Sequence, residues 1–193
     1  MLDGAVPAAK AQHAAPIQKE SDAAREFSSS EYSKRIGGIV AGEPPAIDLA
    51  AEKRLIECLM ALAAEGVVQS AHDVSDGGIA VTVAESCFAS SSSALTSADA
   101  KLGATLSIED GAPAEFSLFG ERGARCVVSA SPAKVGAVLE TARQCEVAAR
   151  EIGRVTADGA LRIEAKGRTV VESSLDSLYD AWANSLERAI NRR

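Results

Sequence analysis

Aromatic residues make up only 4% of this 193-residue sequence, and lysine or arginine clusters interleaved with aromatics are missing. Such clusters bind nucleic acid, because the cations neutralise phosphates and the rings stack on bases. The sequence contains 27 acidic and 20 basic residues, which gives a net charge of −7. We therefore expect no nucleic-acid partner.

Long apolar runs and metal-ligand motifs are also missing. The sequence has no signal peptide and no run of about 18 apolar residues, so we expect no membrane contact and a cytoplasmic location. The cysteines are far apart in apolar stretches, without CxxC or Cys/His ligand spacing: Cys58, Cys87, Cys126 and Cys145. This spacing disfavours a zinc site and favours buried free thiols in a reducing compartment.

Residues 1–46 lack a sustained apolar period. Residues 1 to about 30 are rich in alanine, glutamine, lysine and serine and contain Pro7 and Pro16, and the linker that follows is broken by the Pro44-Pro45 pair. Such a segment has no stripe with which to form a core. The sequence therefore predicts a flexible tail and linker over residues 1–46 and one folded domain over residues 47–193.

The predicted domain alternates helices with short strands. Helices are expected after Asp48, from Ile79, after Ser131-Pro132 and from about Ser174. Strands are expected over 66–71, 104–108, 125–130, 148–155, 161–164 and 169–171, with a hairpin at Asp158-Gly159. This order predicts an α/β or α+β fold in which helices cover a mixed sheet.

Two of these helices carry clear apolar repeats. The helix after Asp48 has Leu55, Leu59 and Leu62 at helical spacing, widened by Ile56 and Ala63. The last helix repeats Leu175, Leu178, Tyr179, Trp182 and Leu186. A repeat of this kind indicates a face that packs on a core, so we expect Trp182 to be mostly buried.

The turn between the strand 66–71 and the following helix concentrates the polar chemistry of the chain. It contains His72, Asp73, Ser75, Asp76, Gly77 and Gly78. Glycines allow close approach to a ligand, and a helix N-terminus favours phosphate. The two acids would repel a bare phosphate, so a bridging Mg²⁺ is the natural arrangement. The alternative interpretation is a helix start capped by Asp76, at which nothing binds.

Together with two further stretches and the closing helix, this turn resembles one enzyme family. The stretches are Ser30-Glu31-Tyr32 before Gly-x-x-Ala-Gly-x-Pro-Pro, and Leu118-Phe119-Gly120-Glu121-x-x-x-Arg125; the closing helix contributes Leu-Tyr-x-x-Trp. From about residue 28 to about residue 190, the chain is similar to the C-terminal part of the synthetase subunit of phosphoribosylformylglycinamidine synthases.

The resemblance implies a fold, a reaction and partners. The fold would be a three-layer α/β/α domain, partly ferredoxin-like, as in aminoimidazole ribonucleotide synthetase. The reaction would be that of an ATP- and Mg²⁺-dependent ligase of purine biosynthesis, which converts formylglycinamide ribonucleotide to its amidine with ammonia from glutamine. The implied partners are the N-terminal region of the synthetase subunit, a glutaminase subunit and a small bridging subunit.

The resemblance also implies roles for individual residues. Asp73 would bind Mg²⁺, and the turn residues His72, Asp73, Ser75, Asp76, Gly77 and Gly78 would bind the nucleotide cofactor. The family subunit is built as two similar halves, and the first-half copy of the Phe-Gly-Glu motif has Glu-Ser-Gln, which touches the substrate. Glu121 matches this pattern and would contact the small-molecule substrate, whereas Arg122 and Gly123 depart from it. The family's catalytic histidine lies upstream of the matched region, so no catalytic residue is assigned and the isolated chain is expected to be inactive.

Other interpretations remain open at the sequence level. The chain could be another member of the same synthetase superfamily, or a non-catalytic assembly module that holds a structural nucleotide. His72 could simply donate a hydrogen bond to a backbone carbonyl. Glu121 could pair with Arg125 as a structural bridge, and Ser30-Glu31-Tyr32 could be linker packing.

Overall fold

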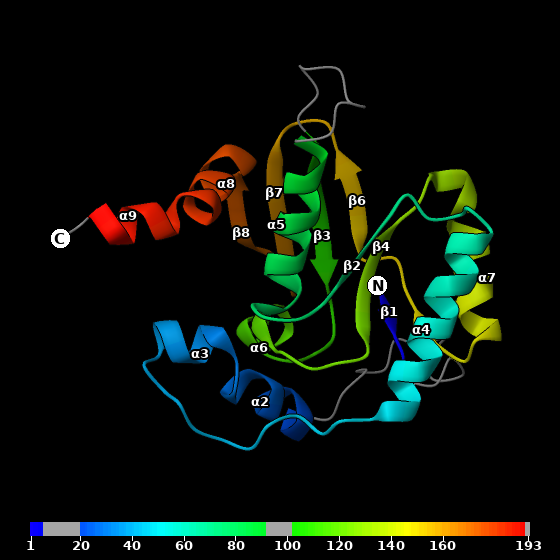
Figure 1. Ribbon diagram of the computed structural model, residues 1–193, viewed down its shortest axis with the longest axis horizontal. Coiled ribbons are helices and arrows are strands. Elements are labelled where there is room, and N and C mark those ends of the chain that lie inside the picture. The colour runs from blue at the N-terminus through cyan, green and yellow to red at the C-terminus, as the bar shows by residue number, and fades with distance from the viewer. Residues whose placement is uncertain (6–19, 92–101, 192–193) are drawn as a thin grey trace. The chain divides into compact units, whose positions relative to one another are not determined.

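Two four-stranded sheets and their helices make up the computed structural model, which describes residues 1–5, 20–91 and 102–191 (Figure 1). The side chains of residues 20, 21 and 89–91 lie outside the description. The chain divides into a first unit, Met1–Thr82 with Glu109–Ile152, and a second unit, Val83–Ile108 with Gly153–Arg193. This division does not coincide with the boundary expected near residue 46. The α/β class is confirmed.

The sheet of the first unit is antiparallel throughout, in the order β2-β4-β1-β5. Its strands are β1 (Leu2–Asp3), β2 (Ser70–Asp73), β4 (Arg125–Ser129) and β5 (Ala148–Ala149). Cys126 of β4 lies opposite Leu2 on one side and Asp73 on the other. The polar turn therefore follows β2, which is an edge strand whose register is set by its pairing with β4.

The helices of the first unit are short except for α4. They are α2 (Glu20–Ser28), α3 (Glu31–Ile36), α4 (Leu49–Ala64), α6 (Ala114–Phe119), the 3₁₀ turn Pro132–Lys134 and α7 (Val135–Gln144). The Asp48 carboxylate accepts a hydrogen bond from the Ala51 N–H at 3.0 Å, so α4 begins where the sequence predicts. Helix α5 (Gly78–Ser91) begins in the first unit, and its residues from Val83 onward belong to the second.

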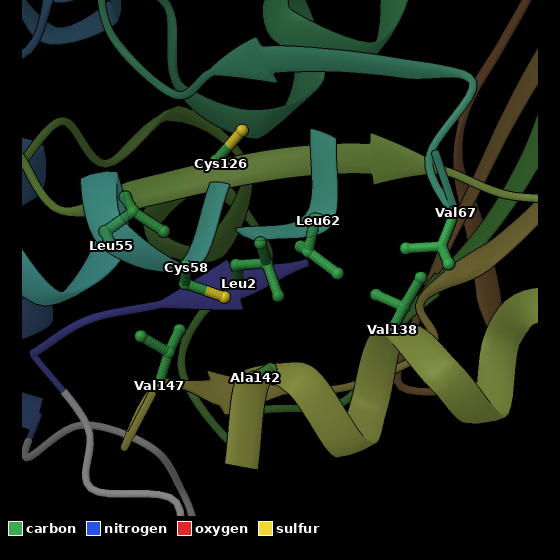
Figure 2. Close-up of a cluster of buried hydrophobic side chains, with 9 residues drawn as sticks. All are labelled: Leu2, Leu55, Cys58, Leu62, Val67, Cys126, Val138, Ala142 and Val147. Carbon is green, nitrogen blue, oxygen red and sulfur yellow. The ribbon is translucent and has the colours of Figure 1, made fainter. Parts of the chain in front are cut away.

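The core of the first unit lies between α4, α7 and β1 (Figure 2). Its members are Leu2, Leu55, Cys58, Leu62, Val67, Cys126, Val138, Ala142 and Val147. Burial raises the pKa of the Cys58 thiol to about 12, as expected of a thiol that stays protonated in an apolar core. The buried cysteines Cys58 and Cys126 are free thiols, as the sequence predicts.

The chain start belongs to this core, which differs from the expected tail. Leu2 is 1% exposed and pairs with both β4 and β5, and residues 20–28 and 31–36 are helical. A strand of two residues has no periodicity that sequence reading could detect. The expectation of a segment without core contacts is therefore wrong for Leu2 and Asp3.

The sheet of the second unit is mixed, in the order β6-β3-β7-β8. Its strands are β3 (Gly103–Ile108), β6 (Gly153–Thr156), β7 (Ala160–Ala165) and β8 (Arg168–Ser174). Strand β3 is parallel to β7 and antiparallel to β6. Helices α8 (Leu175–Ala183) and α9 (Ser185–Asn191) follow β8, and α8 packs on that strand. No described helix is both long and apolar enough to cross a membrane.

Two expectations about residues 148–164 are wrong. The predicted strand 148–155 is two strands, because β5 joins the first sheet and β6 the second. The predicted hairpin at Asp158-Gly159 is absent, because β3 lies between β6 and β7. At Gly103 the start of β3 lies so close to the carbonyl of Ala160 that a Cβ there would collide with it. Glycine permits this insertion.

The predicted burial of the last helix is also wrong. Trp182 is 55% exposed and Leu186 is 72% exposed, and in the predicted repeat only Leu175 is buried. The expected single helix divides at Asn184, the residue after α8. The exposed residues Ile56 and Ala63 likewise lie outside the buried face of α4, although the sequence placed them on it. An apolar repeat predicts a helix but does not say how much of its face is covered.

Candidate functional site

The three sequence stretches that carry the family resemblance meet at one carboxylate. Glu121 Oε1 accepts a hydrogen bond from the Gly77 N–H at 2.8 Å and another from the Glu31 N–H at 2.8 Å. These donors lie 44 and 90 residues away in the sequence. Hydrogen bonds to an ionised acceptor are roughly twice as strong as neutral ones. Glu121 therefore joins the polar turn, the start of α3 and the loop after α6.

Aromatic rings support this junction. Tyr32 stacks on Phe119 with 4.3 Å between ring centroids, and Phe27 stacks on Phe116 at 4.6 Å. The buried Ser30 caps α3, since its hydroxyl accepts the Ser33 N–H at 3.2 Å. The stretch Ser30-Glu31-Tyr32 is thus a capped helix start packed on α6, and not a linker.

The two glycines of the turn have the backbone conformations that glycine favours. Gly77 has φ +81° and Gly78 has φ +63°. A Cβ on Gly78 would lie 2.5 Å from the carbonyl oxygen of Leu118 and 2.8 Å from the Cα of Phe119. The start of α5 therefore lies directly against the Phe-Gly-Glu stretch, which a larger residue would push away.

Both glycine N–H groups already have acceptors inside the chain. The Gly77 N–H donates to Glu121, and the Gly78 N–H donates to the Ser75 carbonyl at 3.0 Å. A phosphate at this point would have to displace Glu121, and its charge would be repelled by that carboxylate. The proposed phosphate cradle of glycine N–H groups does not fit this geometry.

The acidic part of the turn is held firmly by its backbone. The buried Val74 donates its N–H to the Arg125 carbonyl at 3.0 Å. The Asp73 carbonyl accepts from the Thr82 hydroxyl at 3.1 Å, and it lies 2.8 Å from His72 Nδ1. The hydrogen bond of His72 to a backbone carbonyl agrees with the structural alternative raised for that residue.

The side chains on this fixed turn point to solvent. The Asp73 side chain is 75% exposed, and Ser75 and Asp76 are exposed as well. Across the described ranges, no group of three or more His, Cys, Asp or Glu residues could hold a metal ion. Mg²⁺ commonly uses one or two carboxylates together with phosphate oxygens and water. Asp73 fits the role of one such carboxylate, and the remaining ligands would come from elsewhere.

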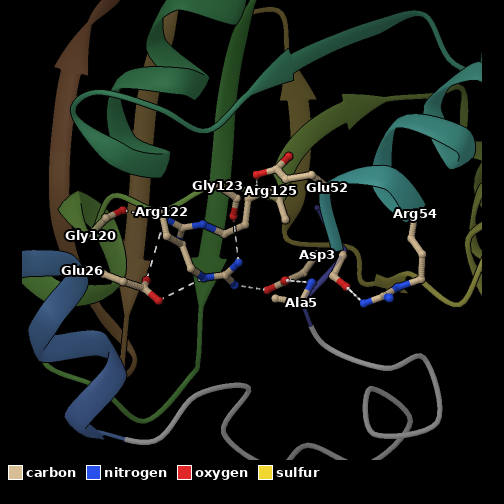
Figure 3. Close-up of polar contacts among 11 residues, drawn as sticks. Asp3, Ala5, Glu26, Glu52, Arg54, Gly120, Arg122, Gly123 and Arg125 are labelled. Atoms are coloured by element: carbon tan, nitrogen blue, oxygen red, sulfur yellow. Dashed lines mark hydrogen bonds and ion pairs between the residues drawn. The ribbon is translucent and has the colours of Figure 1, made fainter. Parts of the chain in front are cut away.

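Arg122, the residue after Glu121 in the sequence, belongs to a buried ion-pair network (Figure 3). Arg122 pairs with Asp3 of β1 and, at 3.0 Å, with Glu26 of α2. The three side chains are at most 10% exposed. Arg122 therefore ties the N-terminal elements to this loop.

Arg125 completes this network. It donates to the Gly120 carbonyl at 2.7 Å and lies 3.9 Å from Glu26. Burial lowers the pKa of Arg125 to about 10, and the nearby Arg122 adds to the shift. Arg125 thus pairs with Glu26 in place of the suggested partner Glu121. Sequence reasoning missed Asp3 and Glu26, for which the only signal was the unusual Arg122.

Comparison with known families defines the class of this domain. The family model described as "AIR synthase related protein, C-terminal domain" matches residues 21–166. This match covers more than half of the chain and includes the polar turn and Glu121. The chain belongs to the family of AIR synthase related C-terminal domains.

Its relatives within that class are synthase subunits. The chain is 34% identical over 167 residues to the phosphoribosylformylglycinamidine synthase subunit PurL of Caldanaerobacter subterraneus, covering 86% of this chain and 21% of that protein. It is 38% identical over 166 residues to PurL of Chlorobaculum tepidum, covering 84% and 21%. The chain thus spans about a fifth of the length of these relatives. The resemblance predicted from the motifs is confirmed.

Solved structures agree with the sequence relatives. Thermotoga maritima PurL complexed with ADP matches with a TM-score of 0.59 and 25% identity, over 69% of this chain and 22% of that one. The same protein complexed with ATP matches with a TM-score of 0.57 and 25% identity, over 66% and 21%. Structure and sequence therefore point to the same family of domains.

Proposed function

We propose that this chain supplies the C-terminal synthetase domain of an ATP-dependent carbon–nitrogen ligase of purine biosynthesis. The ligase converts formylglycinamide ribonucleotide, glutamine and ATP to formylglycinamidine ribonucleotide. The observation that carries the proposal is the meeting of three distant family motifs at Glu121. The PurL relatives and the nucleotide complexes of T. maritima PurL support it.

In this proposal the chain contributes the carboxylate of Asp73 to a larger site. Asp73 provides one carboxylate for Mg²⁺, which would neutralise phosphate charge when bound. Thr82 and the carbonyl of Arg125 fix the backbone around Asp73, so the position of its Cα is set while its carboxylate stays exposed. Phosphoryl transfer depends on positioning, so the chain alone should not turn over ATP.

The proposed partners follow from the relatives. The N-terminal region of a PurL-like subunit would complete the site, and a glutaminase subunit with a small bridging subunit would deliver ammonia. The name of a T. maritima structure, PurLQS, supports the multi-subunit arrangement. At 22% identity, the match to that structure establishes only a likeness of fold. Cytoplasmic residence is part of the same proposal.

Reconstitution tests the proposed function. The chain would be mixed with T. maritima PurL lacking the matched region, and supplied with ATP, Mg²⁺, formylglycinamide ribonucleotide and ammonium. We expect amidine and ADP to form only in the mixture. Asp73→Asn should lower the rate about 10-fold or more, whereas the exposed control Asp22→Asn on α2 should stay within about twofold. A mixture that binds but produces no amidine would contradict the proposal.

A second candidate is a non-catalytic assembly module that holds a structural nucleotide. The internal acceptors of the Gly77 and Gly78 N–H groups favour its non-catalytic character, because they remove two donors that a reacting phosphate would use. In this candidate the structural nucleotide would place its phosphates away from these two glycines. This candidate predicts that the mixture is active and that Asp73→Asn retains the wild-type rate. The Asp73→Asn result therefore separates the two functions.

A further inference from the structure

We infer that Glu121 is a positioning residue, which fixes the acidic turn and the start of α3, and not a ligand of the substrate. The inference concerns the assignment that the family resemblance gives to this residue. Its geometric part stands on the described contacts alone, and its effect on catalysis rests on the proposed function.

The carboxylate of Glu121 already serves two backbone donors. One oxygen, Oε1, accepts two backbone N–H groups at 2.8 Å, from Gly77 and from Glu31. Both donors precede a helix or begin one, where backbone N–H groups lack intrahelical partners. Removing the Glu121 carboxylate would deprive both N–H groups of their acceptor. The resulting loss of stability would exceed the net contribution of the two hydrogen bonds.

The backbone on both sides of Glu121 is closely held. Its own N–H donates to the Glu26 carbonyl at 3.0 Å. A Cβ on the preceding Gly120 would lie 2.6 Å from the Phe116 carbonyl oxygen, so this backbone is closely packed. On the other side Arg122 is held by Asp3 and Glu26. A side chain fixed at both flanks can set the position of what it binds.

The charge of Glu121 also affects which ligands the turn can accept. Glu121 places a negative charge at the N–H of Gly77, where a helix start would otherwise favour an anion. Asp73 and Asp76 of the same turn are exposed. The turn therefore repels phosphate at the glycines while it presents carboxylates outward, which suits a cation. Glu121 thus selects the kind of ligand that this turn can accept.

Amide hydrogen exchange tests the geometric part on the chain as it is. Glu121→Ala should speed exchange at Gly77 and Glu31 by about 10-fold or more, and Glu121→Gln, which keeps an acceptor oxygen, should restore most of the protection. Glu115→Ala, an exposed acid on neighbouring α6, is the matched control and should change neither amide. Unchanged exchange at both amides in Glu121→Ala would overturn the inference.

The reconstituted enzyme separates a positioning residue from a substrate ligand. A positioning residue predicts that Glu121→Ala lowers kcat and raises the KM for Mg·ATP, while the KM for formylglycinamide ribonucleotide stays within about twofold, and that Glu121→Gln recovers most of the loss. If Glu121→Gln instead raises the ribonucleotide KM about 10-fold, Glu121 binds substrate and the inference is wrong.

If Glu121→Ala does not fold, the ribonucleotide KM of Glu121→Gln still distinguishes a positioning residue from a substrate ligand. If the wild-type mixture is inactive, the proposed function fails, and amide exchange still decides the positioning role.

Discussion

Helix α4 of the first unit and helix α8 of the second carry similar apolar repeats in very different surroundings. Cys58 and Leu62 of α4 are fully buried, whereas Leu175 is the one buried residue of the repeat in α8 and Trp182 is 55% exposed. α4 packs against α7 and β1, which bring apolar side chains from distant parts of the chain. The comparison teaches that a repeat specifies the helix, and that long-range partners decide its burial.

Polar groups follow the same division. In the first unit, Asp3, Glu26 and Arg122 form buried ion pairs. In the second unit, the described ion pairs of Arg162 and Arg188 are exposed at the surface. The charges of Asp3, Glu26 and Arg122 are therefore part of the interior, and their removal should cost far more than removal of exposed charges such as those of Arg162 and Arg188.

The largest effect is expected from Arg122→Ala. The substitution takes the cation from the buried Asp3 and the nearer of two arginines from the buried Glu26, which should lower the free energy of unfolding by about 3–5 kcal/mol. The control Arg143→Ala removes an exposed pair with Glu140 and should cost under about 1 kcal/mol. Urea unfolding measures both. Equal losses would mean that the network is exposed to solvent.

Leu62→Ala should come next. Leu62 is 0% exposed in the core of the first unit, so the truncation should cost about 2–5 kcal/mol. Leu186→Ala, at a residue that is 72% exposed, should stay within about 0.5 kcal/mol. Chemical denaturation of the two variants tests the contrast. A loss at Leu186 as large as that at Leu62 would place α9 in a core.

Trp182→Ala should have an intermediate effect. The ring contacts Phe88 and Tyr179, and its Nε1 donates to Glu85 at 3.0 Å, but half of it is exposed. We expect a loss of about 1–2 kcal/mol, below the roughly 3–5 kcal/mol of a fully buried aromatic. Trp182→Phe should recover part of it. A loss of about 4 kcal/mol would instead indicate that Trp182 is buried, as the apolar repeat predicted.

The smallest effect is a pH dependence in the second unit. Hydrogen bonds from Thr156, Arg162 and the Ala160 N–H lower the pKa of Asp158 to about 2. A lowered folded-state pKa adds stability above the unfolded-state value near 4, and this stability is lost as the pH falls toward 2. The unfolding midpoint of Asp158→Asn should therefore change less than that of the wild type between pH 5 and pH 2. Parallel curves for the two proteins would contradict this assignment.

The sequence predicted features that depend on neighbouring residues. The cap at Asp48, the strand at 104–108 and the turn before α5 all follow from local pattern, and the structure confirms them. The family motifs predicted that distant stretches act together, and they do meet at Glu121.

Features that depend on long-range pairing escaped prediction. The insertion of β3 between β6 and β7 and the pairing of Leu2 with two strands leave no local pattern. The acceptors of the Gly77 and Gly78 N–H groups were equally invisible, because a glycine-rich turn looks the same whether its donors face a phosphate or a carboxylate. At the candidate site, residue types were predictable and their partners were not.

The most direct measurement is a titration of the isotope-labelled chain, followed by amide resonances. Mg²⁺ alone and inorganic phosphate alone would each be added to about 10 mM, the range of weak sites. The account predicts that Mg²⁺ shifts the resonances around Asp73, and that phosphate leaves Gly77 and Gly78 unmoved because Glu121 and Ser75 hold their N–H groups. Saturable phosphate-induced shifts at Gly77 and Gly78 would contradict it.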